Sequence, residues 1–235
     1  MSSPGSNSPG SSRCMTALHQ AIIGDDRSRV RSLLVRNPGW AVLPFSSDTF
    51  FDSGICHWIY IGDTALHLAS AGHRVECVRL LLDAGAEVNA VRSRRGGSPL
   101  HYAADGFIEG PEWDARRQVL TLRCLLDHGA DLHVPDANGA TALHRAVRTR
   151  CAAAVRVLLG AGADPGAPNH SGSTPFHLAV QNTGRGGSGT PGARRAQEEI
   201  LREFLARGVS PHLRVGSGKS VMECVRSEWI RRLLS

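Results

Sequence analysis

The chain has 235 residues, of which 41% are hydrophobic and 20% are charged, so it carries enough apolar side chains to bury a sizeable core. No apolar run is long enough for a signal peptide or a membrane-spanning helix, so we expect a soluble, cytoplasmic protein with no membrane partner. The formal net charge of +6 comes almost entirely from arginines that are spread along the chain, which argues against a dedicated nucleic-acid-binding segment.

The N-terminal segment of residues 1–13 consists mainly of serine, glycine, proline and asparagine, and it offers almost nothing to bury. Such a composition predicts a disordered tail. Residues 14–235, in contrast, carry a repeated pattern along their whole length, and we expect them to form a single domain.

A four-residue motif that ends in histidine is the core of that pattern. It occurs at residues 16–19, 64–67, 98–101, 141–144 and 174–177. A second motif, two leucines followed after two residues by a glycine, occurs in register at 81–87, 125–131 and 158–164, with a weaker copy at 204–210. A unit of this length cannot bury its apolar face alone, so the units are predicted to stack into one elongated core.

The unit at residues 62–89 shows how each repeat should fold. Thr64 offers a side-chain oxygen where a helix would begin, and residues 65–71 form a short helix-forming run. Apolar residues at 75, 78, 81 and 82 have helical spacing and predict a second helix with a buried stripe. Gly85 follows that helix, where a left-handed residue ends it at low cost.

On these motifs the chain resembles the ankyrin repeat family over residues 14–235. The resemblance implies an all-α ankyrin-repeat solenoid of helix-turn-helix units with short β-turn fingers. It has about six units, of which the first and last are degenerate caps. It further implies that the recurring histidines, with the Thr before them, hydrogen-bond backbone between neighbouring turns and are structural. These residues are Thr64, His67, His101, Thr141, His144, Thr174 and His177.

Three insertions interrupt the repeats, at residues 42–61, 105–115 and 182–196. The first contains or adjoins half of the aromatic residues of the chain, and the second contains Trp113. Insertions in repeat proteins form loops that are often on a binding face. The aromatic insertion therefore has two interpretations: it seals the end of the core, or its side chains anchor a partner.

The resemblance implies a function in protein binding, since the concave surface of such solenoids usually contacts the partner. Arginine and tyrosine on that surface favour an acidic protein partner. The candidate partner-binding residues are Arg92, Arg94, Tyr102, Asp136, Asn138, Arg145 and Arg148 on the repeats, and Phe50, Phe51, Trp58 and Trp113 on the insertions.

Two other function classes remain open from the residues. One is a basic nucleic-acid-associated regulatory protein. The other is an enzyme with a site at the aromatic insertion 42–61, which a pocket with convergent polar groups there would favour. We nevertheless expect no catalysis, no cofactor, no metal and no small-molecule substrate. The cysteines form no C-x-x-C pair, the histidines recur once per unit, and Cys56 and His57 have no evident third partner.

Overall fold

The computed structural model describes residues 17–51, 55–106, 113–181, 190–212, 214 and 218–235. The predicted tail at residues 1–13 and parts of all three insertions lie outside these residues. Residues 17–23 are helical, and the named helices and strands follow in chain order. They are α2 (Arg27–Arg36), the 3-10 helix η1 (Pro38–Ala41), β1 (Thr49–Phe51), β2 (His57–Ile59), α3 (Ala65–Ala71), α4 (Val75–Asp83), α5 (Pro99–Ala104), α6 (Ala115–Asp127), α7 (Ala142–Arg148), α8 (Ala152–Gly160), α9 (Pro175–Ala179), α10 (Pro191–Ala206), α11 (Val221–Cys224) and α12 (Glu228–Leu234).

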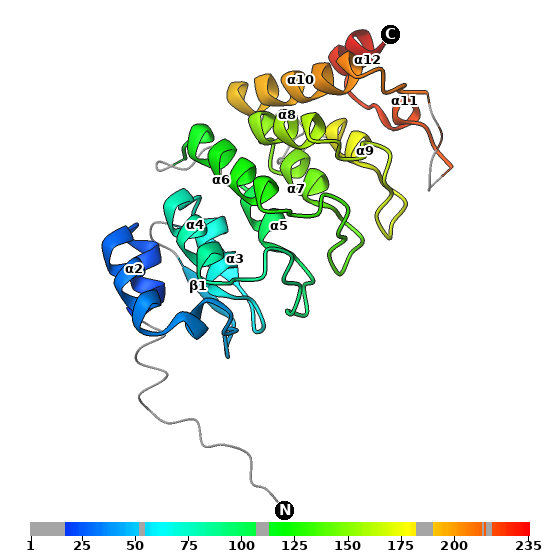
Figure 1. Ribbon diagram of the computed structural model, residues 1–235. Coiled ribbons are helices and arrows are strands. Elements are labelled where there is room, and N and C mark those ends of the chain that lie inside the picture. The colour runs from blue at the N-terminus through cyan, green and yellow to red at the C-terminus, as the bar shows by residue number, and fades with distance from the viewer. Residues whose placement is uncertain (1–16, 52–54, 107–112, 182–189, 213, 215–217) are drawn as a thin grey trace, which may run out of the picture.

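The helices stack as two layers of a solenoid (Figure 1). In one layer α3 packs on α5, α5 on α7 and α7 on α9; in the other α4 packs on α6, α6 on α8 and α8 on α10. The finger turns project on one side of this array (Figure 1). The all-α solenoid predicted from the repeats is therefore confirmed.

The helix pair α3 and α4 shows why the sequence folds this way. Every residue of α3 is buried, which its small side chains permit because α3 lies between α4 and α5. In α4 only Cys77, Val78 and Leu81 are buried, so the predicted apolar stripe forms one face of that helix. Gly85 ends the unit with a φ of 91°, in the left-handed region where glycine has no Cβ to clash.

The recurring histidines connect each unit to the next finger. The backbone N–H of Thr64 donates to Nδ1 of His67 at 3.0 Å, so the proton of this imidazole lies on Nε2. Nε2 in turn donates to the carbonyl oxygens of Ala90 and Gly97, both at 3.1 Å. The same arrangement recurs at His101 to Ala140, at His144 to Ser173 and at His177 to Lys219. Burial lowers the pKa of His67, His101 and His144, so these rings are neutral.

In the last unit a carboxylate replaces the histidine. The backbone N–H of Ser220 donates to Oε2 of Glu223 at 2.6 Å, and the Glu223 N–H donates back to the Ser220 hydroxyl. Glu223 thus accepts the bond that a histidine Nδ1 accepts in the earlier units. A carboxylate has no N–H, so Glu223 cannot make the second bond that the histidines donate to a neighbouring finger.

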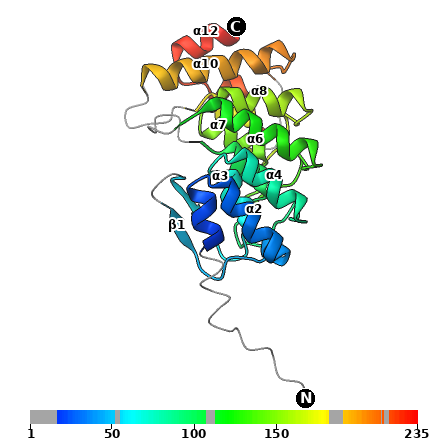
Figure 2. The same cartoon turned by 60° about the vertical axis from the view of Figure 1, so that its left-hand side comes forward.

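The aromatic insertion folds into a hairpin of two short strands, which the sequence did not predict. β1 pairs with β2 in antiparallel register, with Phe50 opposite Trp58. Figure 2 shows β1 beside the first helices of the array. Phe45 is buried against the rings of His19 and Phe51, whereas Phe50 and Trp58 are 45% and 48% exposed. The insertion therefore covers the core with Phe45 and Phe51 and presents Phe50 and Trp58 to solvent.

We expect the replacement of Gly62 by alanine to lower the free energy of unfolding by about 2–3 kcal/mol. Gly62 has a φ of 95°, and a Cβ there would lie 2.5 Å from the backbone carbonyl oxygen of Arg92 in the next finger. Gly85→Ala is the matched control, since its φ is 91° but nothing lies within 4 Å of its Cβ position. The control should lose only about 1 kcal/mol, the cost of the left-handed backbone. If urea unfolding showed the same loss of unfolding free energy for both variants, the close approach of Gly62 to the next finger would not contribute to stability.

Candidate functional site

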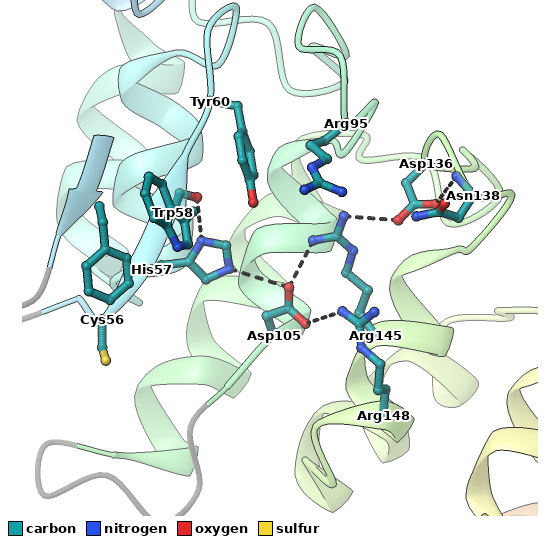
Figure 3. A pocket seen from close by; sticks show the side chains of 11 residues that line it. Cys56, His57, Trp58, Tyr60, Arg95, Asp105, Asp136, Asn138, Arg145 and Arg148 are labelled. Carbon is teal, nitrogen blue, oxygen red and sulfur yellow. Dashed lines mark hydrogen bonds and ion pairs between the residues drawn. The ribbon is translucent and has the colours of Figure 1, made fainter. Parts of the chain in front are cut away.

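A cavity of about 310 Å³ lies between the hairpin and the fingers (Figure 3). We call the surface around it the finger face, meaning the finger turns at 92–97, 136–140 and 169–173 with the exposed side of α7. The hairpin supplies one wall of the cavity, and the finger face supplies the other. The lining residues are Phe50, Cys56, His57, Trp58, Tyr60, Arg95, Asp105, Asp136, Asn138, Arg145 and Arg148.

The floor of the cavity is a buried ionic network. The Arg145 guanidinium donates to Oδ2 of Asp105 at 2.9 Å and to Oδ2 of Asp136 at 3.0 Å. These three side chains are 12%, 10% and 5% exposed, respectively. The other oxygen of Asp136 accepts the backbone N–H groups of Asn138 and Ala140. The network therefore joins α5, α7 and the 136–140 finger.

Charge partners in this network outweigh the cost of burial. Burial by itself raises the pKa of Asp105, but the hydrogen bond with His57 and the charge of Arg145 lower it to about 2. Burial likewise opposes the charged form of Arg145, yet its two carboxylate partners raise the pKa of the guanidinium. Both carboxylates and the guanidinium are therefore ionised near neutral pH.

The hairpin contacts the floor through His57. Nδ1 of His57 lies 2.7 Å from the carbonyl oxygen of Trp58, and Nε2 lies 3.4 Å from Oδ2 of Asp105. Both ring nitrogens therefore face hydrogen-bond acceptors of the protein. In Figure 3 the thiol of Cys56 points away from this imidazole. A nucleophile–base pair is thus not assembled at the aromatic insertion, although the pocket itself is present.

Tyr102 lies beneath the cavity rather than on its surface. Its side chain is 1% exposed, and its hydroxyl donates to Oδ2 of Asp63, which is fully buried. Its ring packs against His57 and His67. A buried phenol cannot touch a partner, so the prediction that Tyr102 forms part of the contact surface is wrong for this arrangement.

The other partner-binding residues predicted from the sequence do not all lie at the cavity. Arg92 forms an ion pair with Glu87, and Arg94 forms one with Asp48 of the hairpin. Trp113 packs edge-on against the ring of His73 and is absent from the cavity lining. Phe51 is partly buried against the core, whereas Phe50, Trp58, Asp136, Asn138, Arg145 and Arg148 all line the cavity.

The remaining lining residues are only weakly indicated by the sequence. Tyr60 belongs to the aromatic insertion, and Arg95 ends a run of finger arginines, so the sequence indicates both as surface candidates. Asp105 follows the last residue of α5, and nothing in its neighbourhood indicates a partner. Its ion pair with Arg145 joins residues 40 positions apart, and only the stacking of α5 on α7 brings them together.

Neither a metal site nor a membrane span is evident in the parts of the chain with described placement. No group of three or more His, Cys, Asp or Glu side chains there could hold an ion. No helix in those parts is long and apolar enough to cross a bilayer. Burial raises the pKa of the Cys77 thiol to about 12 and that of Cys151 to about 11, so these buried cysteines are unreactive.

Three family models match overlapping parts of the chain. A model of ankyrin repeats in three copies matches residues 18–112, a single ankyrin repeat matches 95–137, and a model of ankyrin repeats in many copies matches 125–179. Together they cover the stacked units from the first helix to α9.

Similar curated proteins share the repeats over a limited stretch. The chain is 36% identical over 85 residues to "E3 ubiquitin-protein ligase KEG" of Arabidopsis thaliana and 36% identical over 87 residues to "B-cell lymphoma 3 protein homolog" of Mus musculus. It is 38% identical over 84 residues to "Ankyrin repeat and SOCS box protein 6" of Mus musculus. These alignments cover 36%, 37% and 36% of the chain, but only 5%, 17% and 18% of the relatives. The repeated motifs, the stacked helix pairs and the matching models agree, and the chain belongs to the ankyrin repeat family.

Proposed function

We propose that this chain is a non-enzymatic protein-binding module, or scaffold, that contacts an acidic segment of its partner through the finger face and the hairpin. The supporting observation is the cavity between them. Exposed aromatic side chains on the hairpin stand opposite exposed arginines on the finger face. Aromatic and arginine side chains are the residues most often found at the energetic centre of protein interfaces.

The rigidity of the surface supports this function. The fingers are joined by backbone hydrogen bonds, from Ala137 N–H to the Arg95 carbonyl and from His170 N–H to the Asn138 carbonyl, both 2.9 Å long. The buried histidines hold each finger to the preceding helix pair. A surface that is already ordered loses little conformational entropy when a partner binds. We place the protein in the cytoplasm, where the free thiols of its described cysteines would stay reduced.

Selection from a displayed library of random peptides tests the proposal. We expect enriched peptides to be acidic and to lose at least tenfold in affinity when Arg95 and Arg148 are both replaced by glutamate. The reversal of Arg92, Arg94 and Arg145 is less informative, because these arginines are already paired and Arg145 is buried. Arg116→Glu with Arg123→Glu is the matched control, since both exposed residues lie on α6 and the charge change is the same.

Two results would contradict the proposal. One is the enrichment of no peptide, and the other is equal binding to the reversed and the control variants. The formal net charge of +6 also leaves nucleic acid as a competing partner class. Binding of a random-sequence duplex that persists at moderate salt, while no peptide is selected, would favour that class instead.

A further inference from the structure

The cavity beside the hairpin carries an excess of positive charge. The guanidinium groups of Arg95, Arg145 and Arg148 face the carboxylates of Asp105 and Asp136, and so one positive charge is not balanced. Arg145 is not the source of the excess, because it is buried between both carboxylates. The unbalanced charge therefore lies with the two outer arginines, at the opening of the cavity.

These outer arginines keep hydrogen-bond donors for a ligand. The Arg148 guanidinium is 3.7 Å from Oδ1 of Asp105, beyond hydrogen-bond distance, and its side chain is 60% exposed. The exposed Arg95 guanidinium lies over the ring of Tyr60, 5.1 Å from its centroid, and forms no ion pair with any residue whose placement is described. Figure 3 shows both arginines at the cavity, on either side of Arg145.

Arg145 shows which ligand group fits beside them. Its guanidinium bridges two carboxylates, one just after α5 and one from a finger. Oδ1 of Asp105 is buried and has no hydrogen-bond partner in the described parts of the chain. If a carboxylate entered the cavity, Arg148 could bridge it to this oxygen in the same way. Arg95 would provide the second contact.

The opposite wall supplies an apolar surface next to this charge. Phe50 and Trp58 form a cross-strand pair with ring centroids 5.3 Å apart, and each ring is close to half exposed. A cavity of about 310 Å³ is at the lower limit for ligand pockets, so it has room for one or two side chains of a partner.

We propose that this cavity is an anchor site for an acidic residue followed by an apolar residue in an extended segment of the partner protein. The carboxylate binds between Arg95 and Arg148, and the apolar side chain packs on Phe50 and Trp58. This inference rests on the proposed function and adds the chemistry of the contacted segment. A monoanion matches the single excess charge, whereas a phosphate dianion would leave one negative charge without a partner.

A set of blocked hexapeptides tests the anchor site directly. The first is acetyl-Gly-Ser-Glu-Phe-Ser-Gly-amide, and the readout is the ¹H–¹⁵N resonance of the Trp58 indole, assigned with Trp58→Phe. We expect this peptide to shift the resonance with a dissociation constant of about 1 mM, since so short a peptide makes few contacts. Replacing its glutamate with glutamine, or its phenylalanine with alanine, should weaken binding at least tenfold.

Variants of the protein separate the anchor from a general charge effect. Arg95→Gln and Arg148→Gln should each weaken binding of the glutamate peptide at least fivefold. Arg123→Gln, an exposed arginine on α6, should leave it unchanged. Unchanged thermal unfolding of all three variants would show that the fold is intact, as expected for exposed side chains.

Several results would overturn the anchor site. These are no shift of the Trp58 resonance at 10 mM glutamate peptide, equal binding of the glutamine peptide, and tighter binding of a phosphoserine peptide. A peptide whose C-terminal phenylalanine has a free carboxylate should bind more weakly than the glutamate peptide. If it bound more tightly, the site would recognise a chain terminus rather than an internal acidic residue, and the proposal would be overturned. Library-selected peptides that bind without moving this resonance would keep the proposed function and remove only the anchor.

Discussion

Replacing Arg145 with methionine is expected to lower the free energy of unfolding by about 3–5 kcal/mol, because it leaves two buried carboxylates without their cation. Asp105 and Asp136 are 10% and 5% exposed, and each receives a hydrogen bond of about 3 Å from this one guanidinium. Methionine keeps the length of the aliphatic stem, so the loss reports the charge rather than the packing. Urea unfolding followed by circular dichroism measures the change.

Two further variants show where this energy comes from. Adding Asp105→Asn and Asp136→Asn to the methionine variant should recover part of the stability, because no buried charge is then left unpaired. Arg148→Met should cost less than about 1 kcal/mol, since its side chain is 60% exposed and its contact to Asp105 is long. A methionine variant at Arg145 that is no less stable than the one at Arg148 would show that the network does not hold α5 and α7 together.

The protein is expected to lose stability steeply as the pH falls from about 6.5 to 4. Burial lowers the pKa of His19, His73 and His101 from 6.5 to about 4 in the folded state. Between these values the unfolded chain binds more protons than the folded one, so the free energy of unfolding rises with pH and falls with acid. The full stability is present above pH 6.5. For His101, which is 1% exposed, the loss reaches about 3 kcal/mol by pH 4.

The variant His73→Asn isolates one of these titrations. His73 has a φ of 52°, a conformation that asparagine tolerates well, and asparagine does not titrate. The slope of unfolding free energy against pH between 4 and 6.5 should therefore drop by up to about 1.4 kcal/mol per pH unit. Protonation of Asp105 lowers the stability only at more acidic pH, below about 4, because its folded pKa is about 2. Stability that stays constant from pH 7 to 4.5 would contradict the burial of neutral histidines.

Within a single unit, the sequence predicted the structure closely. The helix expected at residues 65–71 is α3 (Ala65–Ala71), and the left-handed end of α4 is at Gly85 as expected. These features depend on contacts between residues a few positions apart, such as a helix cap or an apolar stripe. The repetition of the pattern then fixed the stacking, since each unit has the same face to bury.

The insertions could not be predicted in the same way. Nothing in residues 42–61 indicated that alternate aromatic side chains would turn inward and outward. That division arises because β1 and β2 pair as a hairpin, whose residues alternate between faces, and because Phe51 on one face packs against Phe45 and the core. The first insertion was expected either to seal the core or to bind a partner. Its structure has aromatic side chains packed on the core and others exposed to solvent, and partner binding stays a prediction.

The sequence by itself determined that the chain is a stack of helix pairs, because helix propensity, caps and apolar spacing are local and are repeated in every unit. The tertiary structure alone decided which arginines are available to a ligand. Arg145 is buried between carboxylates from other elements, and Arg92 and Arg94 donate hydrogen bonds to carboxylates. Arg95 and Arg148 line the cavity, and neither donates a hydrogen bond to a carboxylate of the described residues. Coulomb interactions act through space at a few ångströms, so they depend on which layers meet and cannot be read from positions along the chain.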